Sequence, residues 1–147
     1  MSVTVSIGPT GFTSEVRTGD HAMLADEPVS LGGANKGATP FELLLASLGA
    51  CTVMTLRMYA DRKGWPLEGV RCSLEHARIP ARDCETCESS EGIVTTISRT
   101  VDLHGSLSGD QRERLLEIAE RCPVHRALTG EIHIRTTSGA TGTEAHT

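Results

Sequence analysis

Residues 39–63 read TPFELLLASLGACTVMTLRMYADRK, and this stretch decides the fold. Thr39 suits the N-cap of a helix, Pro40 its first position, and Glu42 completes a capping box. Gly64 predicts where the helix ends. The first two-thirds of the stretch is apolar on nearly every side of a helix, so we expect a helix wrapped by a sheet or by another subunit.

The sequence predicts β-strands on both sides of this helix. Alternating apolar and polar residues predict a strand over residues 3–7 and a hairpin over residues 12–26. Long strands are expected over residues 67–79 and 93–104, the second being rich in Val, Ile and Thr. A charged loop, residues 78–91, joins the long strands.

The C-terminal third of the chain predicts two further helices and a closing strand. Ser108 and Gln111 form a second capping box, which opens a helix that ends near residue 121. Cys122 and the proline after it open a short third helix. We expect the closing strand over residues 131–136.

Length and the grouping of elements predict one α+β domain. The chain has 147 residues, and we expect the domain over residues 1–137 and a disordered tail over residues 138–147. Strands and helices are grouped rather than alternating, which predicts a mostly antiparallel sheet. Because the chain has only four Phe, Tyr and Trp residues, its core gains from surface of a second subunit, and a homodimer is expected.

Charge and composition exclude several classes of partner. The net charge of −5 argues against nucleic acid or an anionic membrane as the main partner, because both need a basic patch. We expect no membrane-spanning segment. Residues 1–7 lack the basic region and apolar stretch of a secretory signal. We therefore expect a cytoplasmic protein.

Two of the five cysteines lie on predicted helices. In a reducing compartment, metal binding or catalysis is the better default than a disulfide framework. Cys51 sits mid-helix beside Gly49 and Ala50, whose small size leaves room for a substrate, although a buried cysteine often only packs. Cys122 precedes Pro123 at a helix start, where the dipole stabilises a thiolate; the alternative is a packed helix corner.

Cys51 and Cys122 together suit a peroxidatic and a resolving thiol. A thiolate that attacks the O–O bond of a peroxide becomes a sulfenic acid, and a second thiol condenses with it to a disulfide. His125 lies close to Cys122 in sequence and adds polarity. Because the cysteines are far apart in the sequence, only the fold can bring them together.

The remaining cysteines leave several alternatives open. Cys84 and Cys87 form a CxxC in the charged loop, and with His76 they supply part of a tetrahedral zinc site, which needs four ligands. A redox-active CxxC and plain exposed thiols are the alternatives. Cys72 shares a strand face with Leu74 and is expected in the core.

Two stretches resemble the signatures of the OsmC/Ohr family. GGANKGATPFELLLASLGAC, residues 32–51, resembles the first, and CPVHRAL, residues 122–128, resembles the second. The order and spacing of elements agree over residues 3–136. The resemblance implies an intertwined homodimer whose antiparallel sheet wraps around the central helices, with active sites at the subunit interface. It also implies reduction of hydroperoxides, preferably organic ones, by Cys51 and Cys122 in oxidative-stress defence, without metal or flavin.

Two positions depart from the best-studied branches of that family. Those branches carry Glu directly after the helix-starting proline, where this chain has Phe41; Glu42 follows and either serves instead or only caps the helix. They also use an N-terminal arginine to hold the thiolate, for which Arg17 is the nearest candidate, with His21 and His125 as alternatives.

The leading hypothesis is a thiol peroxidase served by a thiol reductant. A non-enzymatic protein that binds a small ligand and a metal-binding thiol protein are the alternatives.

Overall fold

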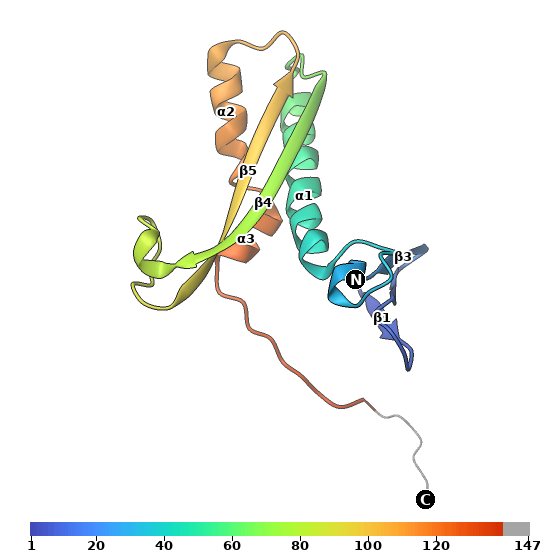
Figure 1. Cartoon of the computed structure of the whole chain (residues 1–147). Coiled ribbons are helices and arrows are strands. Elements are labelled where there is room, and N and C mark those ends of the chain that lie inside the picture. Colours follow the sequence, from blue (N-terminus) through green and yellow to red (C-terminus); the bar gives the residue numbers. More distant parts are fainter. Residues whose placement is uncertain (140–147) are drawn as a thin grey trace, which may run out of the picture.

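The computed structural model describes residues 1–139 and is shown in Figure 1. Over these residues the chain forms a three-stranded sheet, a two-stranded sheet and three α-helices. Every strand pairing in the two sheets is antiparallel. The predicted α+β class is therefore confirmed. The disordered tail expected from residue 138 lies outside the described residues except for its first two.

The N-terminal sheet consists of β1 (Thr4–Ile7), β2 (Ser14–Thr18) and β3 (His21–Ala25), in that order. Gly11 and Gly19 have φ values of 73° and 56° in the two connecting turns, a left-handed conformation that glycine adopts without steric cost. The strand and hairpin predicted at the N-terminus are confirmed. The sheet lies beyond the N-terminal end of the long helix (Figure 1).

Asp26 organises the loop between β3 and the long helix. Its carboxylate is buried and accepts hydrogen bonds from the Thr13 hydroxyl at 2.7 Å and from the backbone N–H groups of Glu27, Ala34 and Lys36 at 2.7, 3.3 and 3.2 Å. The bond from Thr13, supported by those from the backbone, outweighs burial and lowers the pKa of Asp26. The loop that leads into the helix is therefore held around one charge.

The long helix α1 (Pro40–Lys63) begins and ends where the sequence predicts. The Thr39 hydroxyl accepts from the Glu42 N–H at 3.1 Å, and the Glu42 carboxylate accepts from the Thr39 N–H at 2.8 Å. Gly64 ends the helix with φ 69°. The capping box is confirmed, and Glu42 is a partner in it.

Only one face of α1 is covered within the chain. Leu48, Leu56 and Ala60 are buried, whereas a stripe at four-residue spacing is exposed. The stripe consists of Ala46, Ala50, Met54 and Met58. Within one chain the long β-ribbon and the two shorter helices cover that face alone, so the expected covering of the other faces by a second subunit stays a prediction.

The apolar character of α1 also extends further than expected. With 24 residues and a mean hydropathy of 1.5, it is long and apolar enough to cross a membrane by length and composition alone. The expectation that no stretch reaches this length is wrong. A core helix passes the same test, and the packing of α1 against the β-ribbon and both shorter helices identifies it as one.

The β-ribbon consists of β4 (Gly69–Pro80) and β5 (Ile93–His104), which pair along their whole length. A short 3-10 helix, η2 (Ala81–Asp83), lies in the connecting loop. The ribbon runs alongside α1 and α2 (Figure 1). Leu74 and Arg99 are partners in its register, so their side chains share the face turned toward α1.

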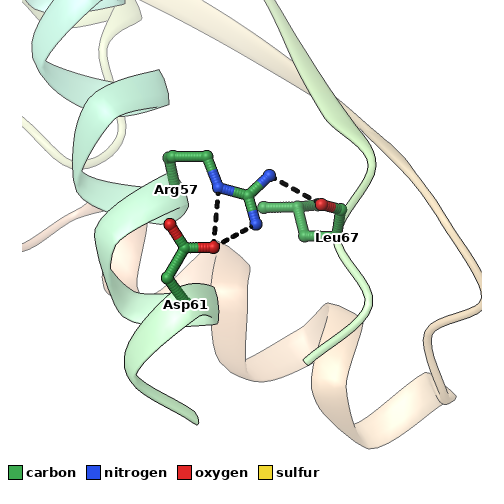
Figure 2. Close-up of polar contacts among 3 residues, drawn as sticks. All are labelled: Arg57, Asp61 and Leu67. Carbon is green, nitrogen blue, oxygen red and sulfur yellow. Dashed lines mark hydrogen bonds and ion pairs between the residues drawn. The ribbon is translucent and has the colours of Figure 1, made fainter. Parts of the chain in front are cut away.

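Arg57 fixes the crossing from α1 to β4, as Figure 2 shows. Its Nε and Nη2 donate to the Asp61 carboxylate at 3.0 and 2.5 Å, and its Nη1 donates to the Leu67 carbonyl at 2.6 Å. An exposed ion pair of this kind contributes at most about 1 kcal/mol. The bond to the Leu67 carbonyl is the part that holds the chain entering β4.

The helices α2 (Gly109–Ala119) and α3 (Pro123–Thr129) follow β5, and both begin where predicted. The hydrophobic core lies where α1, the chain entering β4, and α2 meet. Its buried members are Leu56, Ala60, Leu67, Leu115, Ile118 and Ala119.

The predicted closing strand is absent from the described chain. Residues 131–139 form neither helix nor strand, although Ile132 and Ile134 alternate with polar residues as a strand would. Their side chains are 55% and 80% exposed. The prediction is wrong for a single chain because neither sheet pairs with this segment.

Candidate active site

The fold brings Cys51 and Cys122 together. Thr52, the neighbour of Cys51 in α1, has its hydroxyl 4.0 Å from the Cys122 sulfur, and the Cys51 thiol lies close enough to Cys122 to lower the pKa of the Cys122 thiol. Both are free thiols, Cys51 half-buried and Cys122 fully buried. Cys51 in the middle of α1 and Cys122 at the start of α3 are therefore neighbours.

Cys122 occupies its position because it begins α3. Its backbone is extended at the N-cap, Pro123 takes the first helical position, and the Cys122 sulfur accepts the backbone N–H of His125 at 3.3 Å. The sulfur therefore takes the place that a Ser or Asp oxygen holds at an ordinary helix start.

The surroundings of Cys122 favour its thiolate. Burial raises the pKa of the Cys122 thiol. The hydrogen bond from the His125 N–H lowers that pKa, and those from the side chains of Cys51 and Thr52 lower it further. The positive charge of Arg99 acts in the same direction, and the net result is a Cys122 pKa below its ordinary value.

Arg99 is the site residue that sequence reasoning missed. From β5 its Nη1 donates to the Thr52 hydroxyl at 3.1 Å, and its Nη2 lies 3.0 Å from Nδ1 of His125. Its side chain is half-buried. The signal was present in the strand, because Arg99 falls between Ile97 and Val101 on the side that should be apolar.

The contact with Arg99 determines the tautomer of His125. A guanidinium group only donates hydrogen bonds, so Nδ1 of His125 must accept and the ring proton lies on Nε2. In this contact Nε2 is the ring nitrogen left to donate a hydrogen bond.

A cavity of about 440 Å³ opens beside Arg99 and His125. Its lining mixes apolar and polar side chains. They are Leu48, Thr95, Ile97, Arg99, Glu120, His125, Leu128 and Thr129. This volume lies within the range of small-molecule sites.

Cys72 lies near the pair on the inner face of β4. Burial raises the pKa of the Cys72 thiol, the charge of Arg99 lowers it, and Cys122 raises it. Because the net shift is upward, Cys72 is held as a neutral thiol. It is half-buried, in keeping with the packing role expected for it.

Three other predicted site residues lie elsewhere. Glu42 is engaged with Thr39, nine positions before Cys51 and therefore roughly 13 Å away along the helix. Arg17 on β2 is exposed and pairs with Glu15 at 2.6 Å, and His21 begins β3. Within residues 1–139, none of the three hydrogen bonds to Cys51 or Cys122.

The CxxC lies in the loop after β4. Cys84 and Cys87 form a disulfide with each other. His76, the third residue of the zinc alternative, stacks on Phe41 with ring centroids 4.1 Å apart. In the described part of the chain, no three His, Cys, Asp or Glu residues are grouped to hold a metal ion. The choice between a zinc site, a redox-active CxxC and plain thiols stays a prediction.

The antiparallel sheets and the long central helix define a small α+β protein, and comparison with known families assigns it to one of them. The family model described as OsmC-like protein matches residues 33–137. The chain belongs to this family. A comparison with curated proteins finds no match.

Solved structures of other family members share the fold. An OsmC-like protein from Mycoplasma pneumoniae is 19% identical with a TM-score of 0.69, over 88% of this chain and 86% of that one. An organic hydroperoxide resistance protein OsmC from Legionella pneumophila is 25% identical with a TM-score of 0.62, over 88% of both chains. One from Elizabethkingia anophelis is 19% identical with a TM-score of 0.61, over 87% and 86%.

Proposed function

We propose that this protein is a thiol-dependent peroxidase that reduces organic hydroperoxides through Cys51 and Cys122. The observation that carries the proposal is the proximity of the two thiols: Thr52, next to Cys51 in α1, has its hydroxyl 4.0 Å from the Cys122 sulfur, and Cys51 lowers the pKa of the Cys122 thiol. Burial divides their roles, because Cys51 is half-buried and Cys122 fully buried. A peroxide reaches Cys51 first, and Cys122 then reaches the oxidised Cys51.

The proposed reaction has two chemical steps. Cys51 attacks one peroxide oxygen, the S–O bond forms, the O–O bond breaks, and the released alkoxide takes the thiol proton to leave as an alcohol. Cys122 then attacks the sulfur of the Cys51 sulfenic acid, which forms the disulfide and releases water. A thiol reductant restores the two thiols.

The cavity supports a preference for organic hydroperoxides. Its wall includes Leu48, Ile97 and Leu128, which offer an alkyl group an apolar surface. Each buried methylene contributes about 0.8 kcal/mol. Four of them contribute roughly 3 kcal/mol, on the order of a hundredfold in rate over hydrogen peroxide. Relatives named organic hydroperoxide resistance proteins agree with this preference.

One observation favours a second function, the non-enzymatic binding of a small ligand in the same cavity. Glu42 is held in the capping box by Thr39, so its carboxylate is engaged away from Cys51. A site without that carboxylate has less means of assisting peroxide cleavage. Binding without turnover is the outcome to expect in that case.

We further propose that the protein acts as a cytoplasmic homodimer. The chain exposes 10921 Å², whereas a compact monomer of 15.7 kDa exposes roughly 7,300 Å². Part of the excess belongs to the extended segment after α3, and part to the exposed stripe of α1. A second subunit that covers the stripe would lie one helix turn from Cys51.

The test compares peroxides and cysteine variants. We expect tert-butyl or cumene hydroperoxide to oxidise the reduced protein much faster than hydrogen peroxide, and mass spectrometry to find a Cys51–Cys122 disulfide. Cys51→Ser should abolish peroxide consumption, whereas the control Cys72→Ser should retain it. Peroxide consumption by Cys51→Ser at the parent rate would replace this proposal with the ligand-binding function.

A further inference from the structure

We propose that Arg99 is the positioning residue of the thiol pair: it holds Thr52 and His125 against Cys122 and supplies the positive charge that keeps Cys122 ready to attack the oxidised Cys51. This inference rests on the peroxidase function proposed above.

The geometry is a closed ring of polar contacts around one sulfur. Nη1 of Arg99 donates to the Thr52 hydroxyl at 3.1 Å, and that hydroxyl lies 4.0 Å from the Cys122 sulfur. Nη2 of Arg99 lies 3.0 Å from Nδ1 of the His125 ring, and the backbone N–H of the same residue donates to the Cys122 sulfur at 3.3 Å. Each arm of the guanidinium thus binds the side chain of a residue that also contacts Cys122.

The Thr52 arm places a hydroxyl beside the sulfur. The Thr52 hydroxyl has one proton, and its oxygen accepts from Arg99, so this proton goes either to the Leu48 carbonyl at 2.7 Å or to Cys122 at 4.0 Å. In the structure the proton goes to the Leu48 carbonyl, which is much the nearer acceptor. Arg99 therefore fixes the Thr52 hydroxyl beside the sulfur, from where it can turn to donate to a thiolate.

Within the described residues, Arg99 forms no ion pair with a carboxylate. The ion pairs of the described residues join Arg17, Arg57 and Arg114 to acidic partners, and Arg99 is in none of them. A half-buried cation without a carboxylate is costly unless another anion forms beside it. Glu120 lines the same cavity but is exposed and forms no ion pair with Arg99, and the anion on which Arg99 acts is the Cys122 thiolate, whose pKa it helps to lower.

The ionisable groups around Cys122 come from every element packed against it. They are Cys51 from α1, Cys72 from β4, Arg99 from β5, Glu120 at the end of α2 and His125 from α3. Arg121 and Arg126 are near Cys122 in sequence but exposed, and Arg99 is the positive charge that lowers the Cys122 pKa. The charge of Arg99 also acts on Cys72: burial raises the pKa of the Cys72 thiol, and Arg99 lowers it.

The step that depends on Arg99 is the closure of the disulfide. The Cys122 thiolate attacks the sulfur of the Cys51 sulfenic acid, the S–S bond forms, and the S–O bond breaks. The leaving hydroxide takes a proton and departs as water, so the hydroperoxide is the only oxidant required. Without Arg99, Cys122 is protonated more often and less well oriented, and the sulfenic acid survives longer.

The experiment uses the full chain with Cys72, Cys84 and Cys87 replaced by Ser, which leaves the pair. Thiolate absorbance near 240 nm is followed against pH in the parent, Arg99→Gln and Arg99→Lys, without peroxide. Arg71→Gln is the matched control, because it removes the same charge from the exposed face of the ribbon. Arg71 lies there opposite Asp102 in the register of β4 and β5. Circular dichroism checks that each variant is folded.

We expect Arg99→Gln to move the thiolate transition to higher pH, Arg99→Lys to restore part of the shift, and Arg71→Gln to match the parent. After a hydroperoxide pulse, Arg99→Gln should close the disulfide more slowly at neutral pH, on the order of tenfold, the lower end of what a nearby opposite charge contributes. A folded Arg99→Gln that titrates like the parent overturns the inference. If the parent titrates as expected but consumes no peroxide, the peroxidase function fails and the role of Arg99 in holding the thiolate stands.

Discussion

Thr52 and Arg99 join α1 to β5 through one hydrogen bond of 3.1 Å. Thr52 is fully buried, and its hydroxyl also donates to the Leu48 carbonyl at 2.7 Å. This contact places the helix turn that carries Cys51 against the strand that carries the charge. The thiol site therefore depends on a polar link inside an otherwise apolar packing.

Replacing Thr52 by Val should weaken both the fold and the site. Val fills the same volume but leaves Nη1 of Arg99 without its acceptor, which costs about 1–3 kcal/mol in the free energy of unfolding. We also expect slower closure of the Cys51–Cys122 disulfide after oxidation. Urea unfolding and mass spectrometry of quenched samples measure the two effects.

Thr55→Val, one turn further along α1, is the matched control. Thr55 is half-buried, and among the hydrogen bonds of residues 1–139 its side chain has none to Arg99 or Cys122. Its replacement should leave disulfide closure at the parent rate. Equal rates in Thr52→Val and Thr55→Val would show that the Thr52 hydroxyl has no part in the site.

Much of the fold could be predicted because its signals are local. The capping boxes at Thr39 and Ser108 each place a helix start, and alternation along residues 93–104 places β5 with its observed bounds. Turns, caps and strand faces depend on residues close by in the sequence, so the sequence alone predicts them. The uncovered face of α1 and the unpaired residues 131–139 depend on what lies opposite them, and that is not local.

The site was predicted in part for the same reason. Cys122 was identified from its place before Pro123, and its sulfur caps α3 as that place implies. Arg99 was missed because its partners, Thr52 and His125, come from different elements. Arg17 and Glu42 were proposed by resemblance, and the structure engages them with Glu15 and Thr39.

Asp26 should make the protein sensitive to acid. Its pKa is lowered, chiefly by the Thr13 hydrogen bond, so the carboxylate stabilises the fold above the pKa of an unfolded Asp. That stability is lost as pH falls through the lower, folded value. We expect Asp26→Asn to be less stable than the parent near neutral pH, and the difference to shrink below about pH 4.

The measurement is the urea midpoint as a function of pH, with Asp20→Asn as control. Asp20 lies exposed in the β2–β3 turn, so its replacement should leave the pH profile unchanged. If Asp26→Asn followed the parent at every pH, the carboxylate would not be what holds the loop before α1.

The Cys84–Cys87 disulfide should respond to reductants independently of the thiol pair. The two cysteines are half-buried in the loop between β4 and β5. The loop meets β5 about six residues before Arg99, which is roughly 20 Å along the strand. We expect mild reductant to yield two more alkylatable thiols per chain, and Cys84→Ser with Cys87→Ser to leave the rate of Cys51 oxidation unchanged. Mass spectrometry of alkylated peptides gives both readings.

Metal analysis of the same protein separates the alternatives for this loop. Protein purified without chelator should carry no stoichiometric zinc, because His76 is stacked on Phe41 and the two sulfurs are bonded to each other. One zinc per chain, lost in Cys84→Ser, would instead establish the zinc alternative.

The exposed stripe of α1 should be the centre of a dimer. Met54 and Met58 are 66% and 60% exposed on a helix whose opposite face forms the core, and an apolar stripe of this kind is costly to leave in water. We expect sedimentation at micromolar concentration to give a homodimer that buries more than roughly 2,000 Å². Met54→Glu places a charge in the stripe and should shift the protein toward monomer, whereas Glu113→Gln, on the exposed face of α2, should not. A parent protein that sediments as a monomer would leave the stripe unexplained and would remove the second subunit from the proposed active site.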